Sequence, residues 1–228
     1  IQVQMAWQKN NSEKTPWIRM TNPHAGGGKG MYFIPEIGEE VLIGFESQNA
    51  EKPYVLGTMY NGAESSGYNT EGNDQKAIQT RSGTKIIMND AIGSVFIEDP
   101  SGNTWLMDGK GNIRVKAPKD IIIDAGGNVS ITAGINISTS AGVNISETAG
   151  VDKTATIGMM NNTFVGGNSF INVTGKLVEN ITGNKESNIE KDKETSVNGK
   201  RVSQVNGNHE LHSKSEIVNN SAEKSKFF

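Results

Sequence analysis

Residues 133–150 read AGINISTSAGVNISETAG, and the dipeptide AG returns in this stretch every eight residues. The register continues in both directions, so that residues 109–228 divide into fifteen octads without an insertion. Early octads begin with Ala-Gly, whereas most from Val165 onward begin with Val or Ile and carry Gly at the third position. A period held over this length predicts a repeat architecture. The glycines expected at its corners are Gly126, Gly134, Gly142, Gly150, Gly167, Gly175, Gly183, Gly199 and Gly207.

Within an early octad, apolar and polar residues alternate. Ile135 and Ile137 are separated by Asn136 and followed by Ser138, which is the period of a β-strand. Each octad therefore reads as a short strand followed by a corner at the glycine. Eight extended residues span roughly 27 Å, which is too short to close one coil around an interior.

Two arrangements satisfy this limit. One chain could use three octads for each coil, or three chains could each supply one face and wind around a common axis. The late octads contain roughly one strongly apolar residue in eight, which would fill a single-chain solenoid poorly. We therefore favour a trimeric, intertwined β-helix or β-prism. At about 4.8 Å for each strand layer, fifteen octads make a rod of roughly 70 Å without a long lateral edge.

The first residues contain no repeat. Five short apolar segments, VQMAW, WIRMT, MYFI, EEVLIGFE and YVLGTMY, predict a small OB-like five-stranded barrel over residues 1–62, with its aromatic side chains in the core. Residues 63–80 read as a linker loop, and residues 81–108 as the start of the β-prism. Residues 109–228 form the octad-repeat triple-stranded β-helix. No segment has a helical period, and the predicted fold class is all-β.

Composition restricts the function classes. The chain is 34% hydrophobic with 27 glycines, no cysteine and a net charge of −3, so charge gives no reason to expect a nucleic-acid partner. No apolar run approaches the roughly 20 residues of a membrane span. The loop AGGGKG lacks the strand and helix of a phosphate-binding loop and reads as a connector. The chain begins at Ile1, in what reads as a strand, and we expect a piece of a longer protein.

Residues that could carry chemistry are sparse. The HELH stretch with His209 and His212 lacks the spacing of a helical zinc motif. A metal site is therefore disfavoured, although a trimer would bring three copies of one histidine into one layer and leaves an axial ion open. Carboxylates such as Glu186 and Glu194 alternate with lysines and read as a solvated surface. We expect no catalytic residue, no cofactor and no enzyme activity.

Three sequence motifs resemble the VgrG spike proteins of type VI secretion systems, and are similar to the central spike of contractile phage tails. They are GMYFIPEIGEEVLIGFE, KPYVLGTMYNG and QTRSG, and the octads resemble the trimeric needle of the same family. Lys52 stands where that family usually has Arg. The matching positions are Met31, Phe33, Ile34, Pro35, Gly38, Glu40, Val41, Phe45, Pro53, Gly57, Tyr60, Asn61, Thr80, Arg81, Ser82 and Gly83.

The resemblance implies a homotrimeric spike that caps the tube of a contractile injection machine, punctures the target envelope and delivers effectors. It also implies a tube protein (Hcp-like), baseplate proteins and a PAAR-type tip protein as partners, with Phe227 and Phe228 as part of a tip-docking surface. The spike would assemble in the cytoplasm on the baseplate, cross the target membrane transiently and be extracellular after injection. The alternatives are a trimeric tailspike or adhesin that binds or cleaves surface glycans and, disfavoured by charge, an OB protein that binds nucleic acid.

Overall fold

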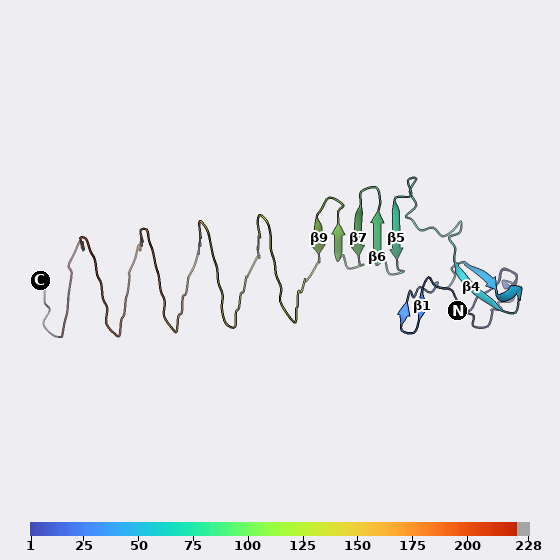
Figure 1. The fold of residues 1–228 in the computed structure, drawn as a ribbon, viewed down its shortest axis with the longest axis horizontal. Helices are drawn as coiled ribbons and strands as arrows, with labels where there is room; N and C mark the ends of the chain where they lie inside the picture. The colour runs from blue at the N-terminus through green and yellow to red at the C-terminus, as the bar shows by residue number, and fades with distance from the viewer. Residues whose placement is uncertain (223–228) are drawn as a thin grey trace. The chain divides into compact units, whose positions relative to one another are not determined.

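The structure is a computed structural model that describes residues 1–222. The chain forms two compact units, of which the first is residues 1–140 and the second begins at residue 141 (Figure 1). The described residues contain nine β-strands and no α-helix, which confirms the all-β class. Within residues 1–222, the only helical turns are two 3-10 segments, η1 (Ala6–Gln8) and η2 (Glu46–Gln48). Among these residues, no helix has the length and apolar character needed to cross a membrane.

The N-terminal module is built around one antiparallel pair. β3 (Val41–Phe45) pairs with β4 (Pro53–Thr58), with a register shift between Leu42 and Ile43. Met20 adds a parallel bridge to Val55, and the amide of Val55 donates to the carbonyl of Arg19. Val55 is the only apolar side chain that the described structure buries fully. The core of the module therefore lies where these three segments meet.

The strands of this module differ from the five expected. VQMAW ends in η1, where the amide of Gln8 donates to the carbonyl of Met5 and the Gln8 side chain accepts from the Met5 amide. The MYFI segment, which is followed by Pro35, forms no strand, and its neighbours form a hairpin of β1 (Ala25–Gly26) and β2 (Lys29–Gly30). Proline has no amide to donate to a ladder. The closed five-stranded barrel remains a prediction.

Several aromatic residues expected in the core are exposed instead. Trp7, Trp17 and Tyr32 have exposed fractions of 75%, 80% and 84%. None of the three lies in a paired strand, so no sheet is present in which alternate side chains would face a core. Within one chain, nothing in the described residues covers these rings.

The second part of the first unit is a five-stranded antiparallel meander. Its strands are β5 (Gln75–Gln79), β6 (Lys85–Asn89), β7 (Ser94–Glu98), β8 (Thr104–Met107) and β9 (Ile113–Lys116), paired in chain order. The expected linker over residues 63–80 is thus shorter than predicted, because β5 occupies its end. β9 lies in the first octad and still pairs within its own chain.

Polar turns fix the register of the meander. At the β7–β8 turn, Asp99 accepts hydrogen bonds from the amides of Ser101 and Asn103, the Ser101 hydroxyl and the Asn103 side chain. Gly102 supplies the left-handed backbone with a φ of 90°. Asp108 repeats the arrangement at the β8–β9 turn with Lys110 and Asn112. The Ser101 hydroxyl, followed by the Asn103 side chain, lowers the pKa of Asp99 to about 2.

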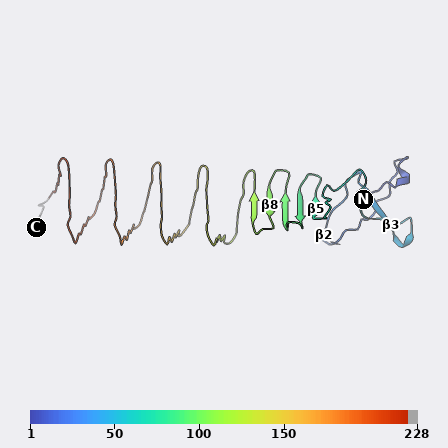
Figure 2. The same cartoon turned by 90° about the horizontal axis from the view of Figure 1, so that it is seen from above.

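Beyond Lys116 the chain changes character. Bends recur every eight residues, at 118–119, 126–127 and onward to 214–215, always at the second and third positions of the octad. Residues 118–220 contain no strand, are all exposed, and make no backbone–backbone hydrogen bond within the described chain. Over residues 141–222, the chain winds as an open coil in both perpendicular views (Figures 1 and 2).

The Asp99 turn predicts an acid-sensitive hairpin. Its folded pKa lies below the ordinary value of 3.8, so the ionised carboxylate stabilises the fold above about pH 4, and that contribution is lost as pH falls toward about 2. We expect Asp99→Asn to lower the melting temperature at neutral pH and to flatten its decline over this pH interval. Thermal melts across pH test this, with Asp120→Asn in the exposed repeat as the control. Parallel pH profiles for Asp99→Asn and the wild type would contradict the assignment.

Candidate functional site: an uncovered apolar face and an unpaired repeat

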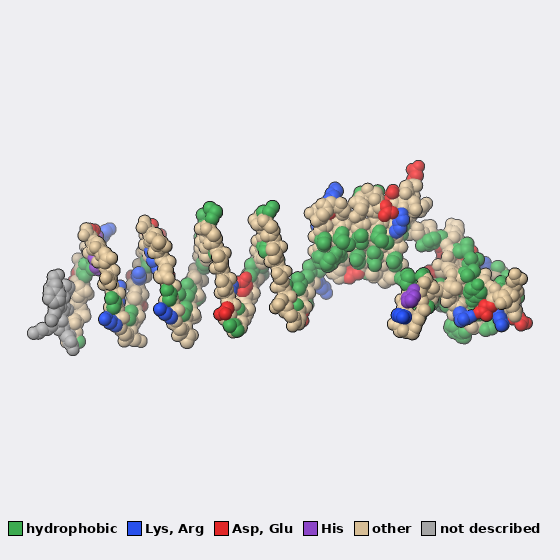
Figure 3. All heavy atoms as spheres, viewed as in Figure 1, with side chains coloured by type: hydrophobic (Ala, Val, Ile, Leu, Met, Phe, Trp, Pro, Cys, Tyr) green, Lys and Arg blue, Asp and Glu red, His purple; other side chains and the backbone are tan. Residues whose placement is uncertain are grey.

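One face of the β5–β9 sheet is almost entirely apolar. The register aligns Ile78, Ile86, Ile97, Trp105 and Val115 in one row across the five strands. A second row contains Met88, Val95, Met107 and Ile113, with Lys76 at its β5 end. Except for Val95, which is half-buried, the apolar residues of both rows have exposed fractions between 36% and 65%. Figure 3 shows hydrophobic side chains gathered over these strands.

The opposite face of the sheet is polar at its margins. Lys85 and Glu98 stand opposite each other on β6 and β7 and form an ion pair at 2.6 Å. The Glu98 carboxylate raises the pKa of Lys85. Arg114 and Lys116 extend the polar surface on β9. The middle row of this opposite face is also apolar and half-buried, and consists of Ala77, Ile87, Phe96 and Leu106. The first face has two apolar rows that are more exposed, so it gains more from being covered, by about 1.5 to 3 kcal/mol for each large side chain that becomes buried.

The backbone of the repeat, like the apolar sheet face, lacks contacts within its own chain. Its amides and carbonyls over residues 118–220 have no backbone partner in the described chain. Figure 3 shows open space between successive passes of the coil. An extended segment with free donors and acceptors along both sides is a template for pairing with other strands. Such a segment has no means of holding a regular shape alone, since even a two-stranded hairpin is marginal in water.

The repeat glycines lie at the bends, but their own chain does not require them. None of the glycines from Gly126 onward has a positive φ, so conformation alone does not demand glycine there. A Cβ added at Gly134, Gly183 or Gly199 would meet nothing within 4 Å. Glycine costs chain entropy on folding, and an open site offers no compensation. Close approach by the backbone of another chain would supply a reason for glycine at these positions.

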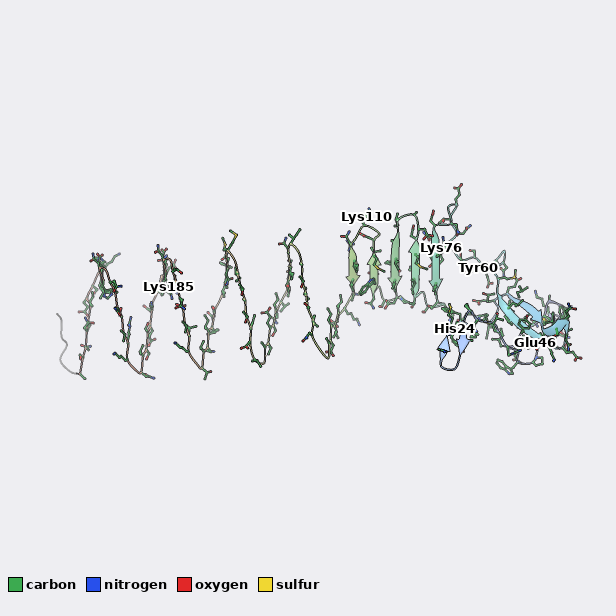
Figure 4. All side chains as sticks on the ribbon, viewed as in Figure 1. His24, Glu46, Tyr60, Lys76, Lys110 and Lys185 are labelled. Carbon is green, nitrogen blue, oxygen red and sulfur yellow. The ribbon has the colours of Figure 1, made fainter. Side chains whose placement is uncertain are left out.

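The described residues do not bring the two histidines of the repeat into a metal site. His212 Nε2 lies 3.3 Å from Glu210 Oε2, and no cluster of three or more metal-ligating side chains occurs within residues 1–222. His24 adjoins the β1–β2 hairpin, where the AGGGKG loop turns back on itself (Figure 4). Gly30 there has a φ of 132°, and a Cβ would lie 2.4 Å from the His24 carbonyl oxygen. Phe227 and Phe228 lie outside the described residues.

Sequence reasoning missed several ion pairs. Arg81 Nη1 lies 3.1 Å from Glu36 Oε2, which links the TRSG motif to the IPEIG motif. In the repeat, Lys153 pairs with Glu147 and Lys185 pairs with Glu179, each across one bend (Figure 4 labels Lys185). Hydrogen bonding to Lys153 lowers the pKa of Glu147. The six-residue spacing of opposite charges around each bend was the available signal.

Comparison with known proteins places the first residues in a defined class of domain. Residues 1–60 match the family described as the type VI secretion system/phage-baseplate injector OB domain. The match covers the module built on β3 and β4 and includes the IPEIG motif. It supports an OB-type domain within the observed all-β fold.

The curated relatives that match part of the chain include VgrG proteins. The chain is 31% identical over 108 residues to the type VI secretion system spike protein VgrG4b of Pseudomonas aeruginosa, covering 45% of this chain and 13% of the relative. It is 28% identical over 109 residues to VgrG1a of the same organism, covering 45% and 16%. The actin cross-linking toxin VgrG1 of Vibrio cholerae is 22% identical over 105 residues, covering 45% and 9%. These matches confirm the resemblance to VgrG spike proteins.

The chain spans less than a fifth of the length of each of these three relatives. The aligned lengths of 105 to 109 residues are shorter than half of the 228-residue chain, so each match leaves more than half of the chain uncovered. The evidence for the role of the repeat therefore comes from its period, its exposure and its unpaired backbone.

The repeat glycines allow a direct test of contact between chains. We expect Gly183→Val and Gly199→Val to destabilise the assembled protein by about 1 to 3 kcal/mol for each overpacked site, although each added side chain has open space in its own chain. Thermal melting and solution mass measure the effect. Asn184→Val, one residue beyond Gly183, is the matched control. Equal melting temperatures for the glycine and asparagine variants would show that no neighbouring chain approaches these bends.

Proposed function

We propose that this chain is the needle and OB collar of a homotrimeric spike in a type VI secretion-like injection machine. In this proposal, three chains wind around one axis, and each supplies strands to the faces of a β-prism. The spike caps the tube, punctures the target envelope and accompanies effectors through it. The similarity to VgrG spike proteins supports the machine, and the geometry of the repeat supports the needle.

The unpaired repeat is the observation that carries the proposal. Residues 118–220 keep an eight-residue bend period without a single backbone–backbone hydrogen bond to their own chain in the described structure. Two further copies wound into the open coil would pair these backbone groups. The apolar face of the β5–β9 sheet would be covered in the same assembly, because three copies of one face can meet at a threefold axis.

The mechanism follows from where the hydrogen bonds would lie. In the interwound trimer, every strand of the needle is bonded to strands of other chains, so no chain can unravel without breaking contacts to its neighbours. Force along the axis is then shared by all three chains. Closed faces leave no lateral edge at which an opposing surface could peel a strand away. Stiffness, and not a reaction at a site, performs the work.

We propose no enzyme activity for this segment. The described residues contain no histidine–carboxylate–nucleophile set, and the ion pairs of the repeat are exposed side chains opposite one another. The alternative function is a trimeric tailspike or adhesin that binds or cleaves surface glycans. It shares the trimer but would require insertions that form a groove, and the octad frame has none.

The partners follow from the same proposal. The OB-type module would face the tube protein and baseplate, and the distal end of the needle would receive a PAAR-type tip protein. Assembly would occur in the cytoplasm on the baseplate, with transient passage through the target membrane and release outside the cell. No nucleic acid is involved.

Solution mass tests the trimer directly. We expect light scattering to give three times the mass of one chain, with bands that resist SDS at room temperature. Incubation with bacterial surface glycans should release no sugar. A monomer at all concentrations would contradict the proposed trimeric needle, whereas a trimer that cleaves glycans would favour the tailspike alternative.

The apolar sheet face provides a sharper test by mutation. We expect Trp105→Lys to dissociate or strongly destabilise the trimer, because it places a charge on the face that the other chains cover. Thr104→Lys, on the neighbouring residue and the opposite face, should leave the trimer intact. Solution mass and thermal melting separate the two. Equal behaviour of both variants would show that the apolar face is not the interface.

A further inference from the structure

The two ion pairs of the repeat occupy the same place in their octads. Glu147 and Glu179 are at the seventh position of one octad, and Lys153 and Lys185 are at the fifth position of the next. A bend lies between the members of each pair, at 150–151 and 182–183. We call two residues at these two positions a corner pair. The two ion pairs show that side chains at these two positions can meet across a bend.

Contact across six residues requires the bend. Six extended residues span about 20 Å, beyond the reach of one lysine and one glutamate side chain. Both side chains of each ion pair therefore lie on the concave side of their bend. In a chain that winds as a coil, the concave side faces the coil axis (Figures 1 and 2). The corner pairs thus point toward the space that the other chains of a trimer share.

The other corner pairs vary in chemistry. Thr139–Ile145 and Ala155–Asn161 join a polar residue to an apolar one, whereas Ser187–Lys193 and Thr195–Arg201 join a hydroxyl group to a cation. Both glutamates at the seventh position face a lysine, and no corner pair joins a charged residue to an apolar one. Five corner pairs combine two large apolar residues, and all ten of these side chains are exposed in the single chain. They are Val115 with Ile121, Ile123 with Val129, Ile131 with Ile137, Ile171 with Leu177, and Leu211 with Ile217.

We propose that Glu147–Lys153 and Glu179–Lys185 form two register layers that fix the alignment of the three chains. This inference rests on the proposed trimer. In the correct alignment, three copies of one ion pair meet in the same layer and make a ring of alternating charge around the axis. The partner for this surface is a second and third copy of the same chain, in one alignment only.

A repeat needs such a device because its octads are alike. A chain displaced by one octad keeps its bends and its strand ladder, so backbone pairing alone does not reject the error. The displaced chain would set Glu147–Lys153 beside Thr139 and Ile145, or beside Ala155 and Asn161, of its neighbours. Charges covered without matching charges are costly, and polar groups in an apolar seam specify register in coiled coils. The two layers are four octads apart, so shorter displacements mismatch both.

The experiment compares the natural chain with one whose register layers are apolar. The variant carries Glu147→Ile, Lys153→Ile, Glu179→Ile and Lys185→Leu, which copies the apolar corner pairs. The matched control carries Ser203→Ile and His209→Ile at an uncharged corner. Since the chain has no cysteine, Ser196→Cys gives each version one spin label, and pulsed electron resonance measures the distances between labels.

We expect one narrow distance for the natural chain and the control, and additional distances in the four-site variant. The displacement along the axis should be about 4.8 Å for each octad of slip. All three proteins should have the mass of a trimer. A single distance in the four-site variant overturns the register layers. A monomeric natural chain overturns the proposed function instead, so the two failures are distinguishable.

A charge-reversal series tests the same proposal if the four-site variant does not fold. Glu147→Lys places lysines on both sides of one corner and should lower the melting temperature of the trimer, and added Lys153→Glu should restore it. An ion pair exposed on the outside of the rod contributes little to stability. Unchanged melting in Glu147→Lys, or no restoration by Lys153→Glu, overturns the proposal.

Discussion

The lack of backbone–backbone hydrogen bonds over residues 118–220 is the constraint on which the rest of this structure depends. A peptide group that gives up water must find another partner, and a single octad strand offers its donors and acceptors along both sides. The described chain pairs the backbone groups of β5–β9 internally, whereas those of residues 118–220 have no backbone partner in it. A regular coil without backbone pairing of its own is one component of a hydrogen-bonded ladder that includes other chains. Pairing between chains therefore decides whether the repeat has a structure at all.

The same constraint accounts for features that look unfavourable in isolation. A chain that is 34% hydrophobic with 27 glycines has little material for a core of its own. Shared among three copies, one apolar residue for each octad fills a narrow interior. The exposed face of the β5–β9 sheet and the open space around the repeat glycines then have one explanation, which is that both lack contacts that other chains would supply. Each feature is costly to one chain and useful to an interwound trimer.

The sequence predicted the periodic part of the fold better than the irregular part. An octad frame of fifteen units specifies the bends because the glycines or their substitutes recur at the second and third positions. The N-terminal module has no such redundancy. Its 3-10 turn depends on one Gln8 side chain returning to Met5, and its short β1–β2 hairpin depends on Gly30. A propensity-based assignment of VQMAW and MYFI as strands could not anticipate these local hydrogen bonds.

The candidate site was harder to predict because it is made of relations between residues. Glu147 and Lys153 look like ordinary surface charges until the bend at 150–151 brings them together. Arg81 and Glu36 are 45 residues apart and meet only through the fold. In a needle of this kind, the residue type at any one position matters less than whether the three chains place that position in the same layer. A repeat that is uniform enough to propagate is also uniform enough to slip, so stiffness requires a few octads that differ from the rest.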